Sequence, residues 1–166
     1  MGRLFGPPDA ALNAYGVDVA EFRRSRTIAA EAQAVWDVLA DFGAISSWAG
    51  IVDHSCLLSP SVQGVGPGTV RRVQVGRDAL VERITEFDPP RALAYDVEGF
   101  PRQLRHLNNR WTLSPANGGT FVTLTTTIEI GHNPLQQLAE RAVVRFSAKQ
   151  LDTMLTGLAE RLEGSP

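Results

Sequence analysis

Apolar and polar residues alternate along most of the chain between residues 19 and 130, which is typical of strands with one buried and one solvent-facing side. Segments rich in glycine and proline, such as 60–68, separate several of these runs. We therefore expect an antiparallel sheet of six to seven strands, formed by residues 19–28, 51–58, 69–75, 79–87, 93–97, 103–113 and 120–130.

The period changes to that of a helix after Glu31, where Val35 and Leu39 recur at helical spacing, and a second short helix or turn is predicted over 44–48. The last predicted element is a long helix. Pro134 suits its first position, and an apolar stripe continues to Leu162. We expect this helix to cover the apolar face of the sheet. The predicted fold class is α+β, a curved antiparallel sheet wrapped around a long C-terminal helix, with two short helices after the first strand.

A predicted hairpin decides which residues of its two strands face the interior. A two-residue turn at 76–77 sets Arg71 opposite Glu82 on a face that is otherwise apolar. A turn shifted by one residue leaves the same residues on that face. The hairpin therefore places two opposite charges on the expected wall of a ligand pocket.

A second hairpin, with its turn at 117–118, sets Trp111 opposite Leu124 on the inner face. The same pairing sets Asn109 opposite Thr126. The reverse face is polar, as expected for the solvated side of an antiparallel sheet. We predict that this outer face is substantially exposed at His106, Asn108, Arg110, Thr123, Thr125 and Thr127.

The composition is that of an ordinary globular protein, since 43% of the 166 residues are hydrophobic and 20% are charged. A net charge of −2 gives no electrostatic footprint for nucleic acid, despite the arginines between 102 and 110. No apolar run approaches the ~20 residues needed to span a bilayer. We expect an N-terminal extension over 1–18 and one ligand-binding domain over 19–163, in a monomer or homodimer.

Residues 1–6 lack the hydrophobic stretch of a secretion signal, and Cys56 is the only cysteine. A chain that cannot form an internal disulfide suits a reducing compartment, so the expected location is the cytoplasm. Cys56 itself is expected to be a small buried hydrophobe rather than a nucleophile. The three histidines, His54, His106 and His132, show no pattern of metal ligands, and we predict neither a metal nor a cofactor.

A set of residues in order along the chain resembles a known family. The set consists of Val35-Trp36, Leu39-Ala-Asp41-Phe42, Trp48, Gly66-x-Gly68-x-x-Arg71, Glu82-Arg83-Ile84, Asp88-Pro89-x-Arg91-x-Leu93-x-Tyr95 and the long final helix. Over residues 19–162 it is similar to the START-like, Bet v 1-like superfamily (SRPBCC), and within it to the bacterial polyketide cyclase/dehydrase and lipid-transport group. The resemblance implies a helix-grip fold with a cavity between sheet and helix that binds hydrophobic molecules.

The candidate site follows from the inner-face assignment and from this resemblance. Arg71 and Glu82 face inward, where a charged pair requires good geometry and further hydrogen bonds. The pair is either a structural salt bridge or a polar anchor for a carbonyl, enolate or carboxylate of a ligand. The predicted ligand-binding residues are Trp48, Arg71, Glu82, Tyr95, Asn109, Trp111, Thr126 and Phe146.

The leading functional hypothesis is binding of a hydrophobic, oxygen-bearing small molecule in an internal cavity, and whether the protein is also an enzyme stays open. A polyketide cyclase or dehydrase would use Arg71 to stabilise negative charge on a carbonyl oxygen and Glu82 as proton acceptor. Tyr95 or Asn109 would then serve as donors. A non-enzymatic lipid or quinone carrier needs the same cavity with little polar apparatus, and a protein-interaction module on the outer face is a third alternative.

Overall fold

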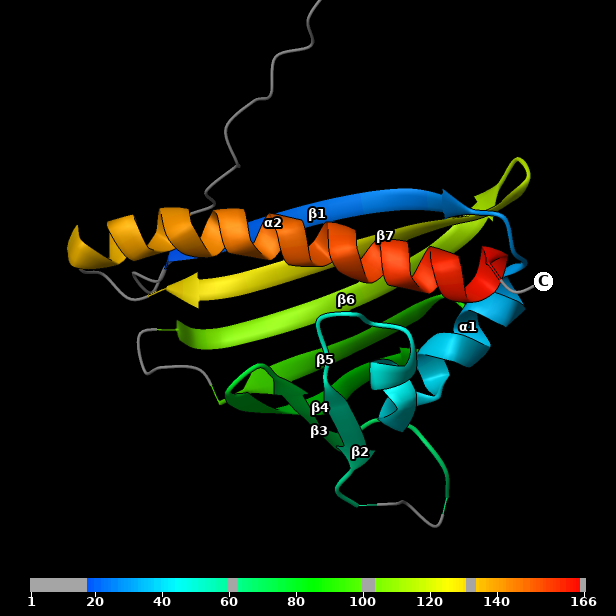
Figure 1. Ribbon diagram of the computed structural model, residues 1–166, viewed down its shortest axis with the longest axis horizontal. Helices are drawn as coiled ribbons and strands as arrows, with labels where there is room; N and C mark the ends of the chain where they lie inside the picture. Colours follow the sequence, from blue (N-terminus) through cyan, green and yellow to red (C-terminus); the bar gives the residue numbers. More distant parts are fainter. Residues whose placement is uncertain (1–17, 60–62, 100–103, 131–133, 165–166) are drawn as a thin grey trace, which may run out of the picture.

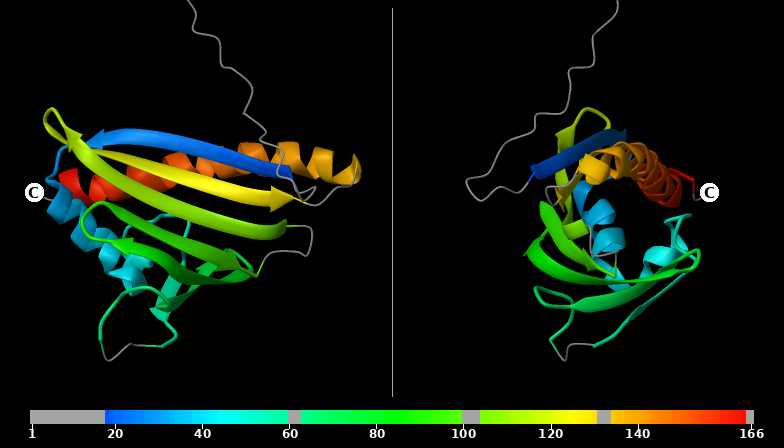
Figure 2. Two further views of the ribbon diagram at one scale, coloured as in Figure 1. Left: turned by 180° about the vertical axis from the view of Figure 1, so that it is seen from behind. Right: turned by 90° about the vertical axis from the view of Figure 1, so that its left-hand side faces the viewer.

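One long helix crosses the concave face of a curved antiparallel sheet, as the computed structural model shows (Figure 1). The structure describes residues 18–59, 63–99, 104–130 and 134–164. At 18, 104–105, 130 and 134–147 only the backbone is described. The end-on view in Figure 2 shows how the sheet curls around the helix.

The described part of the chain forms a seven-stranded sheet in the order β1-β7-β6-β5-β4-β3-β2, in which all neighbours are antiparallel. The first and last strands of the chain therefore lie side by side, and β2 forms the opposite edge. The predicted helix-grip fold is confirmed. The strands are β1 (Asp18–Ile28), β2 (His54–Leu57), β3 (Val70–Val75), β4 (Asp78–Asp88), β5 (Ala92–Glu98), β6 (Leu104–Ala116) and β7 (Gly119–Ile130).

The helices also lie where the sequence predicts them. The helix α1 buries Val35, Trp36 and Leu39 against the sheet, because these residues share one helical face. A 3-10 helix follows directly, and together they are the two short helices after the first strand. The helical segments in the described ranges are α1 (Ala32–Ala40), η1 (Phe42–Ser47) and α2 (Pro134–Glu163).

The C-terminal half of α2 is held by polar contacts against β1 and the residue that follows it. Arg24 Nε lies 3.3 Å from Asp152 Oδ1, and the Glu163 carboxylate accepts a hydrogen bond from the Ala29 N–H at 2.8 Å. The other side of this half faces the sheet. The buried apolar residues there include Leu151, Met154, Leu155 and Leu158.

Both predicted hairpin registers are confirmed. Arg71 lies opposite Glu82, and Trp111 lies opposite Leu124, because the turns fall at 76–77 and 117–118. Gly76 begins the first turn with φ at 58°, in the left-handed region that glycine reaches without strain. The concave face is therefore mainly apolar, with a small set of buried polar or charged side chains: Thr69, Arg71, Glu82, Thr120 and Thr126.

The outer face is less exposed than predicted. His106 and Arg110 are exposed, but Asn108, Thr123, Thr125 and Thr127 are half-buried. These four side chains are shorter than those of His106 and Arg110, and neighbouring strands flank them on both sides. The Thr123 hydroxyl, for example, lies 2.8 Å from the hydroxyl of Ser25 on β1. The assignment of the two faces is confirmed, whereas the expected degree of exposure was wrong for these four residues.

The second strand brings two corrections. It is shorter than the predicted 51–58, because a turn precedes it in which the Val52 N–H bonds to the Ala49 carbonyl at 2.9 Å. Cys56 is exposed rather than buried. It lies on the solvent side of this edge strand, whereas its neighbours on either side are partly buried.

Some predictions fall outside the described part of the chain. Of the expected N-terminal extension, only Asp18 is described, at the start of β1. His132 lies outside the described ranges, and for Phe146 on α2 the side chain is not described. The roles expected for these residues stay predictions. In the described ranges no helix is both long and apolar enough to cross a membrane.

Candidate functional site

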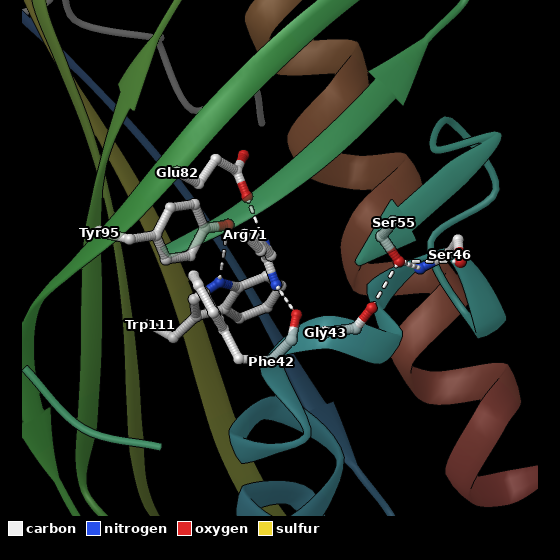
Figure 3. A network of polar contacts seen from close by, with 8 residues as sticks. All are labelled: Phe42, Gly43, Ser46, Ser55, Arg71, Glu82, Tyr95 and Trp111. Carbon is white, nitrogen blue, oxygen red and sulfur yellow. Dashed lines mark hydrogen bonds and ion pairs between the residues drawn. The ribbon is translucent and has the colours of Figure 1, made fainter. Parts of the chain in front are cut away.

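The centre of the candidate site is Arg71, which β3 presents to the concave face of the sheet (Figure 3). Its side chain is 2% exposed and forms an ion pair with Glu82 of β4, in which Nε lies 2.5 Å from Oε2. Arg71 Nη1 donates a second hydrogen bond, to the carbonyl oxygen of Phe42, at 2.8 Å. A buried ion pair is tolerated only with such additional hydrogen bonds, and the backbone of η1 supplies one.

Two aromatic rings enclose the guanidinium group of Arg71. Its Cζ atom lies 3.8 Å from the ring centroid of Phe42 and 4.8 Å from that of Tyr95. The two rings meet edge to face, with their centroids 5.6 Å apart. Aromatic faces at these distances attract a cation through their quadrupoles. A carboxylate, a carbonyl and two rings therefore hold Arg71 in place.

Two buried donors at the site have no hydrogen-bond partner. Within the described residues, the buried side-chain nitrogens of this kind are Arg71 Nη2 and Trp48 Nε1. A buried polar group that loses water without gaining a partner costs about 1–3 kcal/mol. Each of these N–H groups would be satisfied by an acceptor oxygen of a bound molecule.

Tyr95 and Trp111 link these two donors. Trp48 and Trp111 pack edge to face with centroids 6.0 Å apart, and Trp111 Nε1 donates to the Tyr95 hydroxyl at 3.4 Å. Burial above all, together with the charge of Glu82, raises the pKa of Tyr95 to about 12 against smaller opposing effects of Arg71 and Trp111. At neutral pH Tyr95 is an uncharged phenol, able to donate a hydrogen bond.

The structure thus brings together most of the residues predicted to bind a ligand. Asn109 and Thr126 form a pair of their own, in which the Thr126 hydroxyl donates to Asn109 Oδ1 at 2.5 Å. Both lie in the same row across the sheet as Tyr95. The contact chain at the centre consists of Trp48, Trp111, Tyr95, Arg71 and Glu82.

Phe42 has a role at the site that its sequence pattern does not reveal. In the sequence Phe42 is only part of the motif Leu39-Ala-Asp41-Phe42, yet its carbonyl accepts a hydrogen bond from Arg71, 29 residues further along the chain. A hydroxyl group fixes this segment, because Ser55 Oγ donates to the Gly43 carbonyl at 2.7 Å and accepts from the Ser46 N–H at 3.1 Å (Figure 3). No sequence pattern reports such a contact, which depends on how η1 lies against the sheet.

The described histidines are at the surface. His54 and His106 are exposed, and His106 Nε2 lies 2.9 Å from Asp96 Oδ1 on the outer face. In the part of the chain that the structure describes, no group of three or more His, Cys, Asp or Glu side chains is arranged to hold a metal ion. The polar chemistry on the concave face therefore centres on Arg71.

Comparison with known protein families identifies the chain. The model of the family described as polyketide cyclase / dehydrase and lipid transport matches residues 19–163. The chain belongs to this family. A search of curated proteins finds no match.

Several solved structures share the fold of this chain over most of its length. The Zhui aromatase/cyclase from Streptomyces sp. R1128 has 21% sequence identity and a TM-score of 0.64, over 86% of this chain and 95% of its own. A START superfamily protein from Mycobacterium smegmatis has 14% identity and a TM-score of 0.68, over 87% and 97%. Ara h 8.0201 has 18% sequence identity and a TM-score of 0.63, over 84% of this chain and 97% of its own. The predicted membership of the START-like, Bet v 1-like superfamily is confirmed.

Proposed function

We propose that this member of the polyketide cyclase/dehydrase and lipid-transport family binds a hydrophobic, oxygen-bearing small molecule between α2 and the concave face of the sheet. In this proposal, ligand oxygen atoms accept hydrogen bonds from Arg71 Nη2 and Trp48 Nε1. The observation that supports it is that both donors are buried and have no partner. An internal cavity at this position is part of the proposal.

The surroundings of the two donors suit a ligand with apolar rings. Trp48 and Trp111 offer aromatic surface, and Phe42 and Tyr95 do so beside Arg71. Small-molecule sites typically combine such apolar walls with a few polar groups that fix the orientation of the ligand. A hydrogen bond from a cation is roughly twice as strong as one between neutral groups. Arg71 is therefore the main anchor in this proposal, and Trp48 is the second.

Calorimetric titration with 2-acetonaphthone, a neutral aromatic ketone, tests the main anchor. The double variant Arg71→Met/Glu82→Gln removes both charges without leaving either one unpaired, and should bind the ketone about tenfold more weakly or worse. The matched variant Arg110→Met/Glu86→Gln removes an ion pair from the outer face and should bind like the wild type. Unchanged affinity in a well-folded inner-face variant would mean that the Arg71–Glu82 pair is only structural.

The second anchor is tested by Trp48→Phe, which keeps an aromatic ring and removes the indole N–H. The loss of one neutral hydrogen bond, worth about 1 kcal/mol, should weaken binding of 2-acetonaphthone about fivefold. Trp36→Phe is the control, since Trp36 on α1 packs against Phe87 of β4, with ring centroids 5.0 Å apart, and is not part of the proposed site. Equal affinities of the two variants would remove Trp48 from the proposed site.

Catalysis at the same centre is a second candidate function, favoured by the neutral phenol of Tyr95 beside Arg71. Arg71 would stabilise the negative charge that develops on a carbonyl oxygen when a proton leaves the adjacent carbon, with Glu82 as acceptor and Tyr95 as donor. Cyclisation and dehydration of a polyketide-like substrate both begin with such a step.

Deuterium exchange distinguishes this candidate from a carrier. In D2O an enzyme of this kind should accelerate exchange at the methyl group of 2-acetonaphthone, which NMR follows directly. The acceleration should be absent in Arg71→Met/Glu82→Gln and kept in Arg110→Met/Glu86→Gln. Binding of the ketone by the wild type without faster exchange would favour the carrier.

A further inference from the structure

The buried charges at the site already balance before any ligand enters. Among the residues whose side chains the structure describes, which leaves out 134–147 of α2, Arg71 and Glu82 are the only charged side chains that are buried, and they form an ion pair. Tyr95 is the third titratable group at the centre, and its pKa, raised to about 12 mainly by burial, keeps it uncharged at neutral pH. The net charge of these three groups is zero.

The two unpartnered groups at the site are both donors. Arg71 Nη2 and Trp48 Nε1 give hydrogen bonds and cannot accept them. A ligand that satisfies them must bring acceptor oxygens. Ketone and carboxylate oxygens both meet this requirement, so hydrogen bonding alone does not choose between a neutral ligand and an anion.

The charge balance of the site favours a neutral ligand over an anion. A carboxylate that enters a buried site loses its hydration, which is a severe penalty unless an uncompensated cation receives it. The cation of Arg71 is already compensated by Glu82, whose Oε2 lies 2.5 Å from Nε. With an ordinary hydrogen bond to Nη2, a ligand oxygen would lie within about 8 Å of that carboxylate, close enough for like charges to repel where the effective dielectric constant is about 20. A neutral carbonyl accepts the same hydrogen bonds without either penalty.

We propose that this site selects neutral carbonyl compounds over carboxylates of the same size, and that Glu82 determines this selectivity. The inference rests on the proposed function, ligand binding at Arg71, and adds the charge state of the ligand. Glu82 acts as an internal counter-charge, because it occupies the cation that a fatty or aromatic acid would otherwise bind. Ketones and other neutral carbonyl compounds are accepted, and carboxylates are rejected.

Two probes of nearly the same shape, 2-acetonaphthone and 2-naphthoate, test this selectivity by calorimetric titration at pH 7. The wild type should bind the ketone at least about tenfold more tightly than the acid. Glu82→Gln leaves the cation of Arg71 without its counter-charge. This variant should bind 2-naphthoate at least about tenfold more tightly than the wild type does, with little change for the ketone. Glu86→Gln, on the outer face, should keep the wild-type ratio.

Stability requires its own control, because Glu82→Gln removes one partner of a buried pair. Circular dichroism and thermal denaturation establish whether the variant is folded. The ratio of the affinities of the wild type for the two probes is measured without any variant, so it does not depend on this control. Glu82→Asp, which keeps the charge, should keep the preference for the ketone. Equal affinity of the wild type for both probes, or a preference for 2-naphthoate, would overturn the inference and leave ligand binding at Arg71 standing. Failure of the wild type to bind either probe would contradict the proposed function itself.

Discussion

Two arginine–glutamate pairs in the described part of the chain have nearly equal length but lie in opposite surroundings. Arg71 and Glu82 lie on the concave face, with Nε 2.5 Å from Oε2 and side chains 2% and 9% exposed. Arg110 on β6 reaches across β5 to Glu86 on β4, with Nε 2.6 Å from Oε2 and side chains 46% and 38% exposed. The two pairs share their chemistry and differ in burial and in how fully their hydrogen bonds are used.

The outer pair uses its hydrogen bonds more completely than the inner one. Arg110 binds both carboxylate oxygens of Glu86, through Nε at 2.6 Å and Nη2 at 2.9 Å. Arg71 meets Glu82 through Nε alone, gives Nη1 to a carbonyl and keeps Nη2 without a partner. An unmet hydrogen bond costs more in a buried site than at the surface. If a buried pair served stability alone, we would expect all its hydrogen-bond donors to have partners. The inner pair has one donor without a partner, so it is the pair expected to have a further role.

Removing one arginine tests this contrast with the largest expected effect. Arg71→Met leaves the charge of Glu82 buried and alone, and should lower the free energy of unfolding by about 3–5 kcal/mol. Arg110→Met breaks an exposed pair and should lower it by about 1 kcal/mol or less. Urea unfolding measures both. Arg71→Met/Glu82→Gln should recover much of the loss. Similar losses in the two single variants would mean that Glu82 is well solvated, which would remove the basis for a buried polar centre.

Alkaline unfolding gives the next largest effect, and only the inner site should show it. The pKa of Tyr95 is raised from its ordinary value of 10.0 to about 12, chiefly by burial. Between these values the unfolded chain releases the phenol proton while the folded protein keeps it. The stability that the neutral phenol contributes is complete below pH 10 and is lost as the pH rises towards 12, in total about 2–3 kcal/mol.

The control for this effect is Tyr95→Phe, which removes the titrating group and keeps the ring. Its stability should change less than that of the wild type between pH 10 and 12. The difference in tyrosinate absorbance between the two proteins isolates the ionisation of Tyr95. A midpoint near 10 in the folded protein would show that the phenol is hydrated and would weaken the argument for a dry site.

A third effect concerns the backbone that holds Trp48 at the inner site. A Cβ atom on Gly157 of α2 would lie 2.3 Å from the carbonyl oxygen of Trp48. Gly157→Ala should therefore destabilise the protein by about 1–3 kcal/mol, although alanine favours a helix more than glycine does. It should also displace Trp48 and weaken binding of 2-acetonaphthone.

Gly50→Ala is the matched control, since a Cβ there meets nothing within 4 Å and the residue lies two positions from Trp48. Thermal denaturation and calorimetric titration compare the two variants. Full stability and unchanged ketone affinity in Gly157→Ala would show that the close approach of α2 does not position Trp48.

The two faces also differ in how far the sequence predicts them. The pairing of Arg71 with Glu82 follows from alternation and a glycine turn, which are local signals, and the structure confirms it. The carbonyl of Phe42 and the approach of Gly157 to Trp48 depend on how helices lie against the sheet, and no local pattern encodes that. Whether every donor of a buried pair has a hydrogen-bond partner depends on the positions of its side chains, which strand alternation does not determine.

The outer face shows a different limit of sequence reasoning. Alternation correctly assigns Thr123 to that face, but exposure depends on the neighbouring strands, and these half-bury it. Cys56 is exposed for a related reason, because β2 is an edge strand and its outer side has little cover. A pattern along one strand predicts direction, whereas the degree of burial is a property of the whole sheet.

The smallest effect is expected at the outer pair and depends on acid. The hydrogen bond from Arg110 holds the pKa of Glu86 below its ordinary value of 4.5. A carboxyl group whose pKa is lower in the folded state contributes stability above its unfolded pKa and loses it as the pH falls through the folded value. The wild type should therefore exceed Glu86→Gln in stability at pH 7 by less than about 1 kcal/mol, because both side chains are exposed, and the difference should fade in more acidic solution. Urea unfolding of both proteins at neutral and acidic pH measures it. A difference of several kcal/mol, or one that is unchanged in acid, would mean that the outer pair is more than a surface ion pair and would end its use as the reference for Arg71 and Glu82.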